Sequence, residues 1–276
     1  MVAVSLNTNA GAMVALQNLN ATQSTLQNVQ KQINTGLKVA DAMDNGGVFA
    51  IAQNMRSQVG GLQAVTDSLN NVTNVVDVAN SAGTAISNIL VEMKQKAVAA
   101  SDTSIDTTSR KALSEDFTAL RDQITTIVKN ASFNGVNIID GSTFQIAALA
   151  SADAKNHITV SAANLSLGGA VVTITAALSI STQALASAAA AAVDTSLHNV
   201  NNALAKLGTS SKKLSIHSTF VSQLSDALTN GIGNLVDADL AKTSAQLQAL
   251  QVKQQLGVQA LSIANSAPQI LLGLFR

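Results

Sequence analysis

Proline is almost absent from this chain, and its absence constrains the fold more than any other feature of the sequence. Average usage would place about 14 prolines in a chain of this length, whereas Pro268 is the only one among 276 residues. Because proline interrupts helices and central strands, a chain without it can form very long helices. Hydrophobic residues make up 47% of the chain, mostly aliphatic, and such residues can pack long helices side by side.

The rest of the composition argues against several classes of protein. Aromatic residues are 2% of the chain, all of them phenylalanine, which argues against an aromatic-lined ligand pocket. The absence of cysteine excludes disulfides, thiolate metal sites and cysteine nucleophiles. The 16 lysines and arginines balance 16 aspartates and glutamates. We therefore do not expect this neutral chain, which has no basic blocks, to bind nucleic acid.

Neither a signal peptide nor a membrane span is expected. A signal peptide opens on a basic stretch followed by an apolar run, but Lys31 is the first charged residue and polar residues are interleaved before it. No Asp, Glu, Lys or Arg lies between Lys155 and Asp194. That window is nevertheless rich in serine, threonine and glycine, whereas a spanning helix needs about 20 predominantly apolar residues.

Apolar residues recur at alternating spacings of three and four, which is typical of helices that pack along a seam. The longest seam runs without a break from Leu62 to Ala97 and predicts a helical rod of about 50 Å at the α-helical rise. The other seams predict helices over residues 16–37, 113–127, 193–228 and 236–261. Thr107 and Thr108 are candidate N-terminal caps for the helix predicted at 113–127.

Helix breakers and β-branched residues divide these helices. Breaks are expected at 44–47, 101–106 and 230–233, and short strands at 136–139, 157–161 and 170–175. The predicted fold is mainly α, a long antiparallel helical bundle of the N- and C-terminal halves with a small β-containing tip in mid-sequence. The predicted domains are the paired terminal helices (1–43 and 232–276), a helical rod (44–140 and 181–231) and the tip (141–180).

No catalytic, metal or cofactor site is predicted. His157, His198 and His217 lie too far apart in sequence for a local metal motif. Asp237 and Asp239, two residues apart, project from different faces of a helix and suit its positive N-terminal end better than acid–base catalysis. The glycine pair Gly231 and Gly233 lacks both the third glycine and the preceding strand of a dinucleotide-binding loop. The chain is therefore not expected to be an enzyme or to need a cofactor.

Several motifs together resemble the bacterial flagellins. The opening resembles theirs at Ser5-Leu6-Asn7-Thr8-Asn9 and at Ile33-Asn34-Thr35-Gly36-Leu37-Lys38-Val39. The segment Ala131-Ser132-Phe133-Asn134-Gly135 is similar to the family's turn into its β-region. The C-terminal motifs match best, and they lie at 237–241, 250–257, 260–265, 268–271 and 274–276.

The resemblance implies a self-assembling subunit of a hollow flagellar filament, exported unfolded through the flagellum's own channel. It implies paired terminal helices that line the inner core, and partners that include the chain itself or similar flagellins, the filament cap, hook-junction proteins, an export chaperone and the export apparatus. Two alternatives stay open at this point, namely a hook–filament junction protein and a coiled-coil surface scaffold or adhesin.

Two sets of residues follow as candidate functional positions. The candidate self-assembly residues of the terminal helices are Leu6, Leu16, Leu19, Leu26, Ile33, Leu247, Leu250, Leu256, Leu261, Ile263, Leu271, Leu274 and Phe275. The hydroxyls of the tip are candidate acceptors for sugars, as the resemblance implies for some flagellins: Ser142, Thr143, Ser151, Ser161, Ser166, Thr173 and Thr175.

Overall fold

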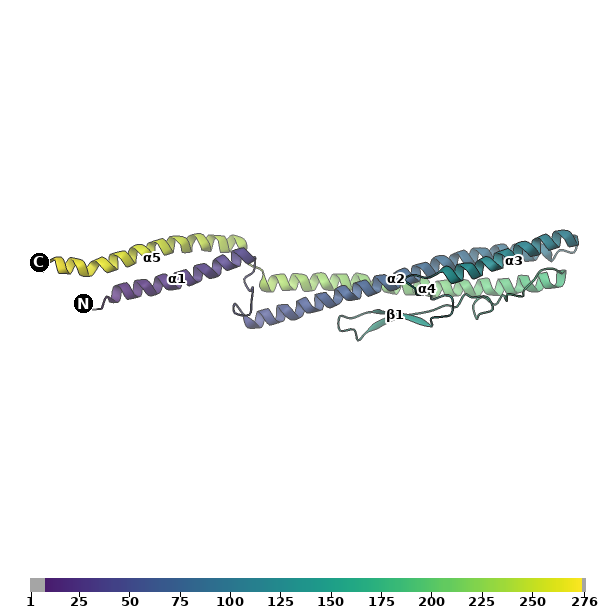
Figure 1. Ribbon diagram of the computed structural model, residues 1–276, viewed down its shortest axis with the longest axis horizontal. Coiled ribbons are helices and arrows are strands. Elements are labelled where there is room, and N and C mark those ends of the chain that lie inside the picture. Colours follow the sequence, from purple (N-terminus) through teal and green to yellow (C-terminus); the bar gives the residue numbers. More distant parts are fainter. Residues whose placement is uncertain (1–7, 275–276) are drawn as a thin grey trace. The chain divides into compact units, whose positions relative to one another are not determined.

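The computed structural model describes residues 8–274, and the side chains of residues 8–266. In this range the chain is mainly helical, with one small antiparallel sheet (Figure 1), as the sequence predicts. It divides into two compact units, one of Met1–Ser57 with Ala227–Arg276 and the other of Gln58–Asp226. The helices are α1 (Ala10–Thr35), α2 (Gly46–Ala100), α3 (Thr107–Asn130), α4 (Gln183–Val236) and α5 (Leu240–Leu274).

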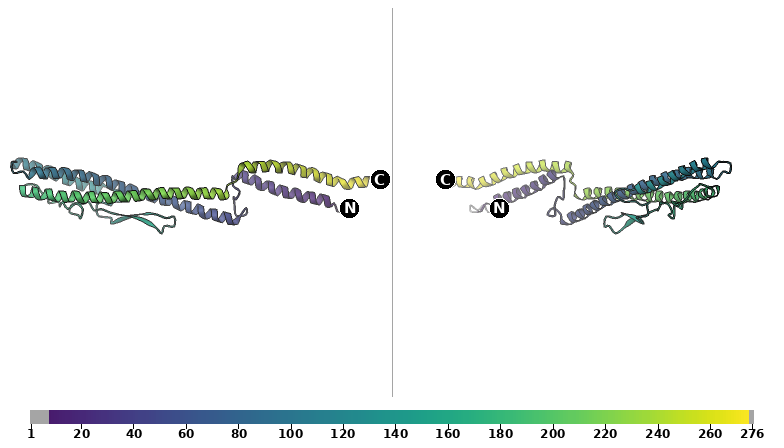
Figure 2. Two further views of the ribbon diagram at one scale, coloured as in Figure 1. Left: turned by 180° about the vertical axis from the view of Figure 1, so that it is seen from behind. Right: turned by 45° about the vertical axis from the view of Figure 1, so that its right-hand side comes forward.

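The first unit is built on α1 and α5, which lie side by side in both views of Figure 2. Asn9 caps α1 by accepting a hydrogen bond from the amide of Ala12 at 3.0 Å. The helix ends at Gly36, whose φ of 71° is the left-handed conformation that favours glycine. Asp239 opens α5 by accepting a hydrogen bond from the amide of Lys242 at 3.0 Å, so its predicted place at a helix start is confirmed.

The second unit contains the long seam, and the seam prediction is confirmed there. Every seam position from Leu62 to Ala97 is buried. The seam includes Gly83, where an added Cβ would lie 2.7 Å from Leu204 Cδ2 of α4. The glycine therefore allows α4 to approach α2 closely at this point. Phe117 and Ile124 of α3 are fully buried, as their spacing predicts.

Two helix boundaries differ from the sequence prediction. The break expected at 230–233 is wrong, because α4 continues to Val236. An added Cβ on Gly231 would lie 2.8 Å from Met55 Cε, so this glycine serves close packing inside a helix and does not end one. The predicted caps Thr107 and Thr108 are also wrong. Instead, Asp106 caps α3: its Oδ1 accepts a hydrogen bond from the amide of Ser109 at 2.6 Å.

The β-region is a hairpin of β1 (Gln145–Leu149) and β2 (His157–Ser161). The strand at 157–161 was predicted, whereas β1 was not. The hairpin lies along the helices of the second unit: the amide of Leu149 donates to Ser68 Oγ at 3.0 Å, and His217 Nε2 lies 2.8 Å from the carbonyl of Ala150. An added Cβ on Gly61 would lie 2.9 Å from the carbonyl oxygen of Ala152, so α2 supports the hairpin turn directly.

The strands predicted at 136–139 and 170–175 do not form. Val172 and Ile174 are fully buried, while Thr173 and Thr175 between and after them are exposed. Buried and exposed side chains thus alternate as in a strand, but this segment has no strand partner. Its backbone bonds to side chains of α4 instead, with the amide of Thr173 donating to Ser196 Oγ at 3.0 Å. Asn134-Gly135 does form the predicted turn, with positive φ at both residues.

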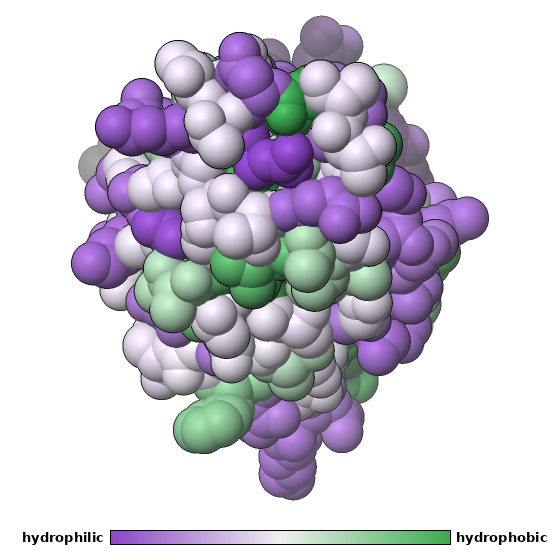
Figure 3. Space-filling model, turned by 90° about the vertical axis from the view of Figure 1, so that its right-hand side faces the viewer, coloured by the Kyte–Doolittle hydropathy of each residue, from purple (hydrophilic) through white to green (hydrophobic). Residues whose placement is uncertain are grey.

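The surface of the second unit at the turn from α2 to α3 is mostly polar. Figure 3 faces the end at which α2 passes into α3. Hydrophilic or intermediate residues cover most of it, and hydrophobic residues gather near its centre. No helix in the described part of the chain is long and apolar enough to cross a membrane.

Candidate assembly surface

The helices α1 and α5 pair in antiparallel fashion along their length. Near the start of α1, Asn9 Nδ2 donates to the carbonyl of Ala264 at 2.7 Å. Further along α1 and back along α5, Gln254 Nε2 donates to Gln23 Oε1 at 2.5 Å. At the far end Leu37 forms a β-bridge with Asp237. These pairs bring the two ends of the sequence together.

The interface between these two helices buries few large apolar side chains. The buried residues of α1 are Thr22, Leu26 and Val29, and Thr243 is the buried residue of α5 within its described side chains. The hydroxyls of Thr22 and Thr243 each donate to the carbonyl four residues earlier, that of Asn18 in α1 and that of Asp239 just before α5, so they add no bond across the pair. The pair therefore has only a thin core.

The structure places the predicted assembly residues in three environments. Leu26 is buried; Leu19, Ile33, Leu247, Leu250 and Leu261 are half-buried; and Leu16, Leu256 and Ile263 are exposed. Leu6 and Phe275 lie outside the described residues, and the side chains of Leu271 and Leu274 lie outside the described side chains. Their roles in assembly stay predictions.

The same two helices expose further large apolar side chains that the seam analysis missed. They are Met13, Val14, Val252 and Val258, with Met13 at 66% exposure. All four lie outside the predicted seam positions. The sequence therefore marked them only as apolar residues on a face that the heptad pattern does not assign to packing. Exposed apolar surface on both helices of a thin pair is typical of a site that another protein surface covers.

A compact joint follows α1 and closes on the end of α4. The amide of Lys38 donates to the carbonyl of Val236 at 2.8 Å, and the amide of Ala238 donates to the carbonyl of Gly36 at 2.9 Å. Beneath these bonds the side chains of Val39, Ala52 and Val236 form a small buried cluster. The joint thus links the loop after α1 to the segment that precedes α5.

An ion-pair cluster holds the loop of this joint. Lys31 Nζ lies 2.6 Å from Asp41 Oδ2 and 2.9 Å from Asp44 Oδ1. The hydrogen bonds from Lys31 hold the pKa of both carboxyl groups below the ordinary value, and the bond to Asp41 is the largest cause that raises the pKa of Lys31. Asp44 Oδ2 also accepts from the amide of Ala40 at 2.9 Å.

Acid is expected to loosen this loop. Because the folded-state pKa values of Asp41 and Asp44 are depressed, their stabilisation is present above the unfolded value of about 3.9 and is lost as pH falls through the folded values. The raised pKa of Lys31 acts at the alkaline end, where its stabilisation is present below the unfolded pKa and is lost as pH rises through the folded-state pKa. Amide exchange at Ala40 measures the effect: protection should fall below about pH 4.

The variant Asp44→Asn is the control for this prediction, since it removes the titrating acceptor of the Ala40 amide. In that variant the protection of Ala40 should be lower at neutral pH and should change less with acid. Protection of Ala40 that stays constant in the wild type down to about pH 2 would contradict the assignment.

Two family models match this chain and account for most of it. Residues 6–143 match the bacterial flagellin N-terminal helical region, and residues 190–275 match the bacterial flagellin C-terminal helical region. The chain belongs to the bacterial flagellin family.

Bacterial flagellins resemble this chain over its whole length. The chain is 52% identical over 272 residues to flagellin FljM of Caulobacter vibrioides, covering 99% of this chain and 98% of the relative. It is 36% identical over 281 residues to a flagellin of Brucella melitensis, covering 99% of each. The crystal structure of Bacillus cereus flagellin shares the fold at a TM-score of 0.50 and 20% identity, covering 56% of this chain and 88% of that one.

Flagellins are structural proteins, and two histidines of this flagellin have contacts of different kinds. His217 bonds the hairpin turn, while His198 Nε2 lies 3.8 Å from Asp194 on the same helix. Among the described residues no group of three or more His, Cys, Asp or Glu side chains is placed to hold a metal ion.

The candidate sugar acceptors of this flagellin differ in how freely their hydroxyls point outward. Ser142, Ser151, Ser166 and Thr173 use theirs in hydrogen bonds within the hairpin region and to α4. Ser161 and Thr175 are exposed, and Thr143 is half-buried. Attachment of sugars at any of these positions stays a prediction.

Proposed function

We propose that this chain, a structural subunit of the bacterial flagellar filament, polymerises into a hollow helical tube whose inner layer is formed by α1 and α5. The observation that carries the proposal is the exposed apolar surface of a helix pair with a thin core, including Met13, Val14, Leu256 and Ile263. Fully burying one such side chain contributes about 1.5–3 kcal/mol. Packing α1–α5 pairs from many subunits together would bury these side chains.

The proposal extends to how the subunit reaches its place. We infer that an export chaperone and the flagellar export apparatus carry it unfolded out of the cell, and that it joins the filament beneath a cap protein and above hook-junction proteins. The absence of cysteine supports this route, because a chain without disulfides can pass unfolded through a narrow channel. The extracellular filament is where the related flagellins assemble.

Mixed filaments are part of the proposal. Caulobacter vibrioides has several flagellins, FljM, FljO and FljK among them, that are 51–53% identical to this chain over nearly its whole length. Proteins this similar share their helices and seams, so their terminal pairs would pack into one tube.

The two alternatives are less well supported. A coiled-coil scaffold or adhesin would assemble without joining its ends, whereas here α1 and α5 pair and the joint ties Gly36 to Ala238. A hook–filament junction protein would share the terminal helices. The relatives that match over the full length are named flagellins, which favours the filament subunit.

Reconstitution tests the proposal. Purified subunit is added to short filament fragments, and the product is examined by negative-stain electron microscopy. We expect long, uniform tubes that grow from the fragments in proportion to the added subunit. Thin fibres without a central channel, or subunits that stay monomeric at high concentration with active fragments, would overturn it.

A further inference from the structure

The helix α4 carries an uncompensated positive stretch in the second unit. Between Asp194 and Asp226 it contains Lys206, Lys212 and Lys213 and no acidic residue. All three lysines are exposed. Among the residues whose side chains are described, none of them forms an ion pair, whereas Lys94 of α2 pairs with Asp194.

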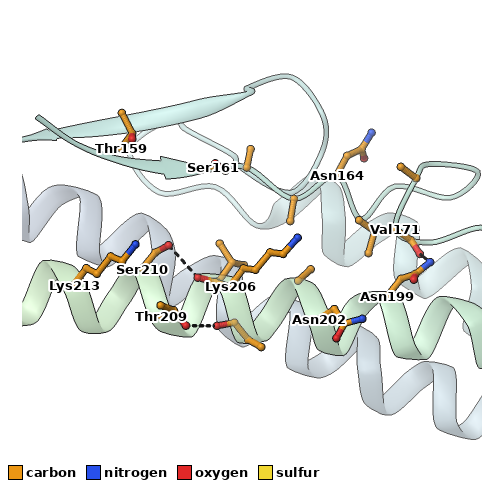
Figure 4. A pocket seen from close by; sticks show the side chains of 16 residues that line it. Thr159, Ser161, Asn164, Val171, Asn199, Asn202, Lys206, Thr209, Ser210 and Lys213 are labelled. Carbon is orange, nitrogen blue, oxygen red and sulfur yellow. Dashed lines mark hydrogen bonds between the residues drawn. The ribbon is translucent and has the colours of Figure 1, made fainter.

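Two of these lysines line a groove of about 870 Å³ between α4 and the segment that follows β2. Its wall combines apolar residues of α4 and of the segment after β2 with polar ones that include Thr159, Ser161, Asn164 and Ser210, and no carboxylate lines it. Figure 4 shows Lys206 and Lys213 rising from α4 toward the hairpin side of the groove. Seven residues separate them, so they lie on one face of α4, about 10 Å apart along its axis.

The helix α2 carries the opposite charge on its outer face. Between Arg56 and Lys94 it contains no lysine or arginine, whereas Asp67 and Asp77 are both exposed. They belong to one exposed stripe of short polar side chains at spacings of three and four, which includes Asp67, Asn70, Asn74, Asp77, Ser81 and Thr84. Neither aspartate forms an ion pair within the described side chains; Gln63 donates to Asp67 at 3.2 Å.

We propose that the groove of α4, at Lys206 and Lys213, receives the Asp67–Asp77 stripe of α2 from a second copy of this chain. The inference rests on the proposed function and deepens it, since it names the surfaces that join neighbouring subunits outside the terminal pair. Within one subunit α2 and α4 meet through other residues, at Gly83 and Leu204. Their charged faces are therefore left for another molecule.

The chemistry of the two surfaces fits this assignment. A contact between two different surfaces of the same chain is heterologous, and repeated contacts of that kind produce an open helical polymer. Complementary charge orients the docking and sets its position along the helix. Asp67 and Asp77 are about 15 Å apart along α2, whereas Lys206 and Lys213 are about 10 Å apart along α4. The flexible lysine side chains can reach over this difference of about 5 Å. The stripe's short side chains let the two helices come close.

A charge exchange tests the proposal. In the variant Lys206→Glu with Lys213→Glu, both the groove and the stripe carry acidic side chains. In the variant Asp67→Lys with Asp77→Lys, both carry basic side chains. Each double variant should raise the critical concentration for seeded polymerisation about tenfold, because each neighbour contact then repels. The chain with all four substitutions restores opposite charges and should polymerise within about twofold of the wild type.

Matched controls separate this contact from net charge and from folding. Lys129→Glu with Lys155→Glu makes the same change of net charge as the lysine double variant, in the same unit and at residues that belong to neither the groove lining nor the stripe. It should polymerise as the wild type does. Circular dichroism of each monomer checks that its helices are intact. Wild-type polymerisation with no effect of either double variant would overturn this inference alone, as would a fourfold variant no better than the doubles. A wild-type chain that forms no tube would overturn the proposed function and this contact with it.

Discussion

Replacing both Leu256 and Ile263 with aspartate is expected to abolish filament growth while the monomer keeps its second unit folded. The two side chains lie seven residues apart on α5, and 58% and 70% of their surfaces are exposed in the single subunit. If neighbours cover them in the tube, each substitution loses about 1.5–3 kcal/mol of apolar burial. It also places an unpaired carboxylate in an apolar contact.

The measurement for this pair is the critical concentration for growth on filament fragments, by sedimentation. We expect an increase of at least about 100-fold, since two buried side chains together supply more than the 2.8 kcal/mol that this factor represents. The control is Gln255→Asp with Ser262→Asp, at the adjacent exposed polar positions. It carries the same charge on the same helix and should grow nearly normally. Equal loss in the control would show that added charge, and not the apolar face, blocks growth.

Replacing Asn137 with alanine is expected to destabilise the second unit by about 2–5 kcal/mol. Asn137 is buried at the end of the segment that follows α3. Its Nδ2 donates to the carbonyl of Val128 at 2.7 Å, and its Oδ1 accepts from the amide of Ile139 at 2.9 Å. Alanine would leave both backbone groups buried without a partner, among the fully buried side chains of Ile138 and Ile139.

Urea unfolding of the monomer measures this loss as a lower midpoint at an unchanged slope. The control is Asn130→Ala, because Asn130 is exposed at the end of α3 and surface changes of this kind usually stay within about 0.5 kcal/mol. A loss below about 1 kcal/mol for Asn137→Ala would mean that water replaces both bonds and that the side chain does not hold this turn.

The terminal pair shows how far the heptad pattern reaches. On α5 the positions Thr243, Leu247, Leu250, Gln254 and Leu261 lie at the predicted spacing and are buried or half-buried. On α1 the buried face includes Thr22 and Val29, while the predicted seam residue Leu16 is exposed. Residues 16–37 offer more than one apolar line, and contact with α5 selects among them.

The sequence by itself determined the helices, their seams and the family. Helical period and the absence of proline are local properties, so the long seam of Leu62–Ala97 and the strand at 157–161 could be predicted without knowing their partners. Motifs in order along the chain likewise need no structure.

Only the tertiary structure decided the features that depend on residues far apart. Gly231 and Gly233 looked like a break, yet α4 passes through them, because Ile232, Leu235 and Val236 pack into the joint. That packing offsets the cost of about 1 kcal/mol for each helical glycine. The Lys31 cluster, the support of the hairpin by α2 and the basic groove of α4 join segments between 10 and well over 50 residues apart. No local pattern specifies such contacts, because they stabilise the protein only after folding has brought the distant segments together.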